Sequence, residues 1–276
     1  MAATTFRRKD PVVKAVRRSA AAHLDGAIAA LTGSRADREA ARREVERLGS
    51  LLRLVQRPLG SAAVSRERRV LQRALQQLAP REAPGAAALR ALAAAEPAVD
   101  VGVLLQETFP EGEAPDRPDP DPEVLRLLAD LAEVRMRARY WHLPAGGFAV
   151  LAPGLSWAYR GALKAASAEP SCGASAAWRT LGDQVQLLER AWPEQLAPLR
   201  KSLRAAQKRA EALSAFAGLA EPVGDHPQLR PRLDAQTARL TAEARADRLR
   251  LLAESPAAFV KRLGAYWTAW RGEDAA

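Results

Sequence analysis

Two stretches of the sequence are similar to each other: LLRLVQRPLG at residues 51–60 and QVQLLERAWP at residues 184–193. When they are aligned, apolar positions coincide and one arginine coincides with another: Leu52 with Val185, Leu54 with Leu187, Val55 with Leu188 and Arg57 with Arg190. The two stretches lie 133 residues apart. An offset this long is typical of a duplicated, domain-sized unit and not of a short solenoid repeat. The sequence therefore predicts two related halves.

The composition favours helices. Hydrophobic residues make up 48% of the 276 residues and aromatic residues only 5%, so the apolar mass consists of Ala, Leu and Val. Ala, Leu, Arg and Glu are strong helix formers, and no run of alternating β-branched residues is long enough for a strand. The single cysteine, Cys172, excludes an internal disulfide and a cysteine-based zinc site. We expect an all-α protein.

The net charge of +10 is unevenly distributed. Residues 1–100 carry +9, residues 101–130 carry −6 and residues 131–276 carry +7. Two basic lobes therefore flank an acidic connector. A basic excess favours a polyanionic partner, and the alternative is an arginine-rich surface that only faces solvent.

The spacing of apolar residues predicts helices between segments rich in Pro and Gly. In 36–58, for example, Val45, Leu48, Leu52 and Val55 share one face, and Asp37 is positioned to cap the first turn. The expected helices span 11–31, 36–58, 62–79, 86–98, 123–141, 148–167, 174–191, 194–218 and 228–254, with a short one over 256–270. Breaks are expected at HLPAGG (142–147), EPSCGAS (169–175) and EPVGDHP (221–227).

The domain organisation follows from the acidic, proline-rich stretch FPEGEAPDRPDPDPE at 109–123, which cannot continue a helix. We expect a first helical half over 10–108, an irregular exposed linker over 109–122 and a second helical half over 123–270. Short connections between antiparallel helices give bundles, so each half is expected to be an antiparallel helical bundle.

Three blocks of the sequence resemble the CHAD family, the conserved histidine α-helical domain. They are LLRLVQRPLG with SRERRVLQRALQQLAPRE (65–82), WHLPAGGFAVLAPGLSWAYRGALK (141–164) and QLLERAWPEQLAPL (186–199). The resemblance covers roughly residues 10–220. It implies two pseudo-symmetric helical bundles forming one domain, with a basic groove that binds inorganic polyphosphate through a His-x-x-Arg-x-x-x-Lys stripe from each half.

The sequence departs from that stripe at most positions. The first-half positions are Glu39, Arg42, Glu46, Gly49 and Arg53, and the second-half positions are Cys172, Ser175, Arg179, Gly182 and Gln186. Neither histidine is present, and only Arg42, Arg53 and Arg179 keep the expected charge. Glu39 and Glu46 lie within one turn of Arg42 and can pair with it, while a carboxylate beside a polyanion repels it. The resemblance therefore implies weakened binding.

Other cations lie at helical spacing near these blocks, including Lys201, Arg204 and Lys208. The predicted polyanion site comprises Arg42, Arg53, Arg66, Arg73, Arg160, Lys164, Arg179 and Arg204. We expect no catalytic residues, because no phosphate-binding Gly-rich loop, HExxH motif or nucleophile elbow is present. We expect no metal site or cofactor, because His23, His142 and His226 are far apart in the sequence.

The leading hypothesis is a non-enzymatic cytoplasmic protein that binds inorganic polyphosphate or a similar polyanion. The second is a helical scaffold that acts through protein or storage-granule contacts without binding an anion. Nonspecific nucleic-acid binding is a third and less favoured hypothesis. No segment has the 18 apolar residues that a membrane span needs, so we expect no membrane insertion.

Overall fold

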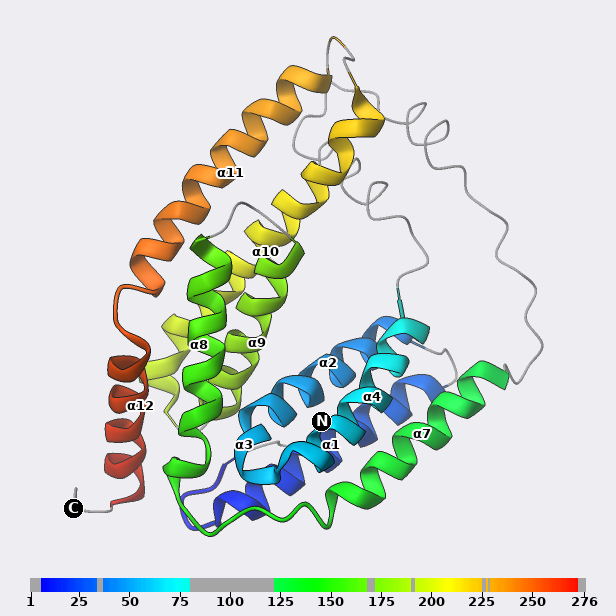
Figure 1. The fold of residues 1–276 in the computed structure, drawn as a ribbon, viewed down its shortest axis with the longest axis vertical. Helices are drawn as coiled ribbons and strands as arrows, with labels where there is room; N and C mark the ends of the chain where they lie inside the picture. The colour runs from blue at the N-terminus through cyan, green and yellow to red at the C-terminus, as the bar shows by residue number, and fades with distance from the viewer. Residues whose placement is uncertain are drawn as a thin grey trace.

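The computed structural model describes residues 6–33, 37–79, 122–167, 172–189, 192–224, 227 and 229–272. Within these residues the chain forms α-helices and one 3-10 turn, and no strand (Figure 1). The predicted all-α fold class is confirmed. No helix in this part of the chain is long and apolar enough to cross a lipid bilayer.

The helices follow the predicted order. Their bounds are α1 Val12–Thr32, α2 Arg38–Leu54, α3 Gln56–Leu59, α4 Ser61–Gln77, α7 Pro122–Ala138, the 3-10 turn η1 Phe148–Val150, α8 Ala152–Ser167, α9 Cys172–Glu189, α10 Pro193–Val223, α11 Leu229–Leu251 and α12 Pro256–Arg271. The predicted helix at 86–98 and residues 109–121 of the predicted linker lie outside the described residues. Pro122, the last linker residue, begins α7, which suits the preference of proline for a first helical turn.

Helix α2 begins where the sequence predicts and ends earlier. The Asp37 side chain accepts a hydrogen bond from the backbone N–H of Ala40 at 2.8 Å, which confirms the predicted N-terminal cap. The expected single helix over 36–58 is wrong, because α2 ends at Leu54 and a separate turn, α3, follows. Pro58 has no N–H, and its ring would clash with the carbonyl of Leu54 in a continuous helix.

Two of the predicted breaks are shorter than expected. Helix α9 already begins at Cys172, inside the stretch predicted as a break at 169–175. Helix α10 continues to Val223, although a break was expected from residue 221. The break at 142–147 is confirmed and separates α7 from η1.

The helices form two groups (Figure 1). In the first, α1 packs against α2 and α7, and α4 packs against α2 and α7. In the second, α9 packs against α8 and α10, while α11 packs against α10 and α8, and α12 against α8. Helix α7 therefore lies with α1 and α4, although it follows the predicted linker in sequence. The chain passes from one group to the other after α7.

The two groups meet where α2 packs against α8 and α9, and α3 against α8. One apolar core runs through both groups and includes the predicted core residues Val45, Leu48, Leu52 and Val55, all at most 1% exposed. Gly154 at the start of α8 allows the closest approach. A Cβ on that glycine would lie 2.1 Å from the carbonyl oxygen of Leu54. Helix α8 is therefore packed directly on the end of α2.

Aromatic side chains fill the core as expected. Trp141, Tyr159, Trp178 and Trp192 are at most 5% exposed. Trp267 of α12 has edge contacts with the rings of Trp192 and Trp270 and with that of Phe6 near the N-terminus. The N-terminal and C-terminal segments of the described chain therefore pack together.

Candidate polyanion cleft

The two stripes of the sequence face each other across the α2–α9 contact. Arg179 on α9 donates to Glu46 on α2 at 2.7 Å, and Ser50 on α2 donates to Asp183 on α9 at 2.9 Å. Both pairs join residues 133 apart, the same offset as the sequence repeat. A four-residue step along α2 matches a four-residue step along α9, so the two helices run in the same direction where they touch.

A cleft of about 160 Å³ opens at this contact, between α2, α9 and α10. Its described lining residues are four arginines, two acids, two glutamines and one glycine: Arg43, Arg47, Arg179, Arg204, Glu46, Asp183, Gln186, Gln207 and Gly182. Four of them, Glu46, Arg179, Gly182 and Gln186, are positions of the predicted stripes. Arg204 lies outside the stripes but belongs, like Arg179, to the predicted polyanion site, so the structure brings parts of both halves together here.

Glu46 occupies the centre of the charge network. Its Oε1 accepts from Arg179 at 2.7 Å and from Arg42 Nε at 3.2 Å. The expected pairing of Arg42 with Glu46 is thus confirmed. Glu39 does not join this network as expected, because its carboxylate pairs with Arg43 at 3.5 Å. The single carboxylate of Glu46 therefore neutralises two of the three stripe cations that the sequence retains.

Arg179 reaches two carboxylates at once. Its second terminal nitrogen donates to Glu211 of α10 at 2.8 Å. Burial alone lowers the pKa of the Arg179 guanidinium, but the Glu211 hydrogen bond and the charge of Glu46 outweigh it and raise that pKa. Arg179 thus joins α2, α9 and α10.

Two other arginines of the cleft, Arg47 and Arg204, differ in whether a carboxylate neutralises their charge. Arg47 pairs with Glu44 at 2.5 Å, and the same carboxylate contacts Nδ1 of the buried His23 at 2.7 Å. Arg204 donates to the neutral amide of Gln186 at 3.1 Å, and no carboxylate of the described chain lies within 4.0 Å of it. Burial, with the nearby charges of Arg200 and Arg47, lowers the pKa of the Arg204 guanidinium. Arginine nevertheless stays charged at neutral pH.

Asp183 is the second acid that lines the cleft. Burial raises the pKa of its carboxyl, while the Ser50 hydrogen bond and the charges of Arg47 and Arg179 oppose that shift. Asp183 is therefore held by α2 through Ser50 and lies close to the cations of Arg47 and Arg179.

A wider depression of about 900 Å³ continues from the cleft along α10. It shares Arg204 and Gln207 with the cleft, and its other charged residues are Arg200, Lys201, Lys208 and the acid Glu211, which binds Arg179. Arg200 pairs with Glu189. Lys201, Arg204 and Lys208 are exposed, and in the described chain none has a carboxylate within 4.0 Å. The cations therefore form one continuous track from α2 along α10.

The remaining predicted site residues lie outside this track. Arg53 on α2 donates to Thr180 at 2.8 Å and lies over the ring of Trp157. Its pKa is lowered, first by burial and then by the charge of Arg68, while the Asp183 charge opposes the shift. Arg53 therefore helps to hold α2, α8 and α9 together.

The other four lie on α4 and α8. Arg66 pairs with Glu67 and Arg73 with Asp130, each at 3.3 Å. Arg160 donates to a backbone carbonyl of its own helix, and Lys164 is exposed. None of the four lines the cleft or the depression, and their role in binding stays a prediction.

Sequence reasoning missed Arg43, Arg47 and Arg200. Arg43 and Arg47 are four residues apart, so they lie on the same side of α2, and this spacing was a usable signal. Arg200 precedes the Lys201 group by one residue, but nothing in the sequence places it beside α2. In the described chain, no group of three or more His, Cys, Asp and Glu side chains could hold a metal ion.

No protein-family model, no curated protein and no solved structure matches this chain.

Proposed function

We propose that this protein binds inorganic polyphosphate, or a similar polyanion, along the track of cations that begins in the cleft and continues on α10. The observation that carries the proposal is the meeting of Arg43, Arg47, Arg179 and Arg204 in one cleft. Charge-assisted hydrogen bonds from arginine to phosphate are short and directional. A linear polyanion matches a linear track, because many weak contacts act together.

The proposal includes a fold built from two pseudo-symmetric bundles. The first residues of α2, α4 and α7 precede those of α9, α10 and α12 by 134, 132 and 134 residues, close to the repeat offset. The packing repeats as well: α1 lies on α2 and α7 as α8 lies on α9 and α12, and α2 lies on α4 as α9 lies on α10. This agreement supports a CHAD-like duplication, with the cleft at the contact between its halves.

We further propose that Glu46 weakens the site. Its carboxylate holds Arg42 and Arg179, so two guanidinium groups must give up a partner before they can bind phosphate. Hydrogen bonds to charged groups contribute about 1.5–3 kcal/mol each. The phosphate must compete with that gain and with the repulsion from the carboxylate itself.

The test is calorimetric titration of long-chain polyphosphate at about 50 mM and 200 mM salt. The variant Arg43→Gln/Arg204→Gln removes two cleft cations that have weak or neutral partners. It should bind roughly tenfold or more weakly than wild type. The control Arg230→Gln/Arg239→Gln removes two cations from α11, where each pairs with an acid of its own helix. Equal weakening in both variants, or no wild-type binding at the lower salt, would reject the proposed site.

A gain of binding provides the complementary test. Glu46→Gln keeps the size of the side chain but removes its charge, so polyphosphate should bind more tightly. Asp234→Asn on α11 removes the same charge from an exposed position as the control. If the two variants change the affinity equally, Glu46 has no special position in the site.

A second candidate function, protein contact, is favoured by one observation. Helix α7 and the turn that follows it expose an apolar stripe at helical spacing: Leu125, Ala129, Ala132, Met136 and Tyr140. Leu125 and Met136 are each 50% exposed, and Tyr140 is 77% exposed. Exposed apolar stripes mark interaction surfaces. If polyphosphate does not bind but Leu125→Glu/Met136→Glu lowers the sedimentation coefficient, this function replaces the first.

A further inference from the structure

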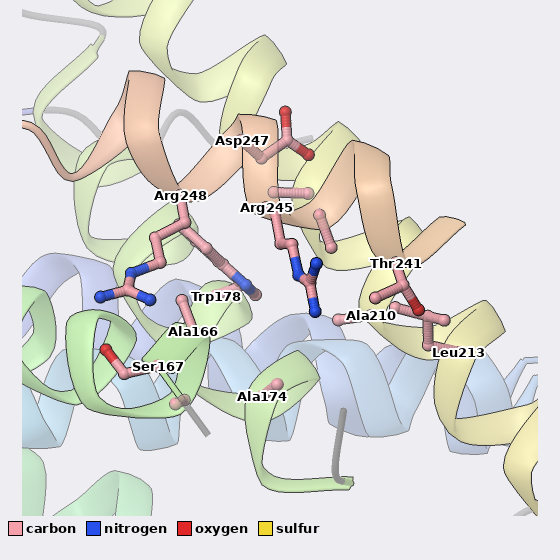
Figure 2. A pocket seen from close by; sticks show the side chains of 13 residues that line it. Ala166, Ser167, Ala174, Trp178, Ala210, Leu213, Thr241, Arg245, Asp247 and Arg248 are labelled. Carbon is pink, nitrogen blue, oxygen red and sulfur yellow. The ribbon is translucent and has the colours of Figure 1, made fainter. Parts of the chain in front are cut away.

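A second pocket, of about 320 Å³, lies between α8, α9, α10 and α11 (Figure 2). Small side chains create the space: six of its lining residues are alanines, namely Ala165, Ala166, Ala174, Ala206, Ala210 and Ala244. Trp178 and Leu213 complete the apolar walls and are at most 4% exposed. A volume of this size is at the lower end of the range of small-molecule sites.

Two arginines of α11 give the pocket its charge. Arg245 and Arg248 are three residues apart, and Figure 2 shows both side chains extending from α11 across the pocket. Within the described residues, no carboxylate lies within 4.0 Å of either guanidinium. Both cations are therefore available to a ligand.

The one acid among the described lining residues does not compensate them. Asp247 points away from the two arginines in Figure 2. Its carboxylate pairs with Arg209 at 2.5 Å and with Arg250 at 3.1 Å. The pocket thus combines apolar walls with two unbalanced positive charges.

We propose that this pocket binds a small amphipathic anion, with an apolar body against the alanines and Trp178 and a carboxylate between Arg245 and Arg248. An apolar ligand without a charge would leave the arginines unused, and a polyanion would gain nothing from the apolar walls. Arginine binds a carboxylate through two parallel hydrogen bonds, which fixes the orientation of the ligand.

This pocket is separate from the polyanion cleft. Trp178 lines the pocket, whereas its neighbour Arg179 lines the cleft, so the two sites use different faces of α9. Helix α11 contributes to the pocket and contributes none of the described lining residues of the cleft. The proposal therefore stands or falls independently of polyphosphate binding.

The test is calorimetric titration with hexanoate, octanoate and decanoate, below the concentrations at which these chains aggregate. Each added methylene that enters the pocket should tighten binding about fourfold, until the pocket is filled. The neutral alcohol 1-octanol should bind roughly tenfold or more weakly than octanoate. The absence of saturable binding by any of the carboxylates, or equal binding of the acid and the alcohol, would overturn the proposal.

Two variants separate the roles of charge and space. Arg245→Gln/Arg248→Gln should reduce octanoate affinity roughly tenfold or more and leave 1-octanol affinity unchanged. Arg230→Gln/Arg239→Gln changes the net charge of α11 equally and should have no effect on either. Ala210→Leu fills the pocket and should abolish binding of both probes, while a thermal melt confirms that it folds. Retained octanoate binding in the arginine variant or in the filled variant would place the ligand elsewhere.

Discussion

Replacing Gly154 by alanine tests the close approach that joins the two groups of helices. The added Cβ would lie 2.1 Å from the carbonyl oxygen of Leu54, and 2.5 Å from its carbonyl carbon and Cα. All three are backbone atoms, so no side-chain rotation can relieve the contact. Helix α8 would have to move away from the end of α2 by about 1 Å before ordinary contact distances return.

The size of the effect follows from two opposing contributions. Alanine in place of glycine stabilises a helix by up to about 1 kcal/mol. Overpacking a tight contact costs about 1–3 kcal/mol, occasionally more. Here α8 also carries Leu155 and Tyr159, which are buried in the core and would shift with it. We expect a net loss of about 2 kcal/mol in the free energy of unfolding, which lowers the melting temperature by roughly 4–8 °C.

Gly161 in the same helix provides the matched control. A Cβ at that position would meet no atom within 4 Å. Gly161→Ala should therefore stabilise the protein by up to about 1 kcal/mol, because only the helix propensity changes. Denaturant unfolding followed by far-UV circular dichroism measures both variants. If Gly154→Ala is as stable as Gly161→Ala, the reasoning about the close contact between α8 and Leu54 is refuted.

Three further outcomes are expected. Arg137→Ala should cost up to about 3–5 kcal/mol, because the fully buried Glu67 loses the 2.8 Å ion pair with Arg137 and keeps only the 3.3 Å contact with the more exposed Arg66. The exposed Arg139→Ala should cost little, and equal losses would contradict this. Burial raises the folded-state pKa of Asp183 above its ordinary 3.8. The folded state then binds more protons than the unfolded state, and the free energy of unfolding falls as the pH rises from that value. Asp183→Asn should flatten this part of the pH profile, and an unchanged slope in denaturation from about pH 4 to 7 would contradict it. Polyphosphate affinity should fall steeply with salt and with shorter chains, and a salt-independent affinity would show that phosphate contacts do not drive binding.

The sequence predicted helices well where an apolar face and a cap coincide. Helix α2 shows why: the buried face of Val45, Leu48 and Leu52 and the Asp37 cap are both local patterns. The signal for the break after Leu54, Pro58, is also a local one. The apolar periodicity continues to Val55, however, and favours a helix that extends past Leu54. The predicted breaks at 169–175 and 221–227 extend into α9 and α10, because a proline near a helix end does not by itself stop a helix that is packed along its length.

The candidate cleft was only partly predictable. The repeat offset anticipated that Glu46 and Arg179 occupy equivalent positions, but equivalence in sequence does not say that two side chains touch. The contribution of Arg204 and its neighbours depends on how α10 crosses α9, which is set by packing between helices. The pocket at Arg245 and Arg248 left no sequence signal, because alanines that create space look the same as alanines that only favour a helix.

The offset of the Glu46–Arg179 pair has a consequence for the order in which the protein folds. Within each group, helices that follow one another in the chain pack together, such as α1 with α2 and α9 with α10, so these contacts close short loops and form quickly. The α2–α9 contact joins residues 133 apart and must close a far longer loop. We therefore expect these neighbouring helix pairs to form first and the docking of α9 on α2 to come later. The cleft exists only once α9 has docked on α2. An anion that binds there therefore binds the docked state alone and stabilises it relative to the undocked state.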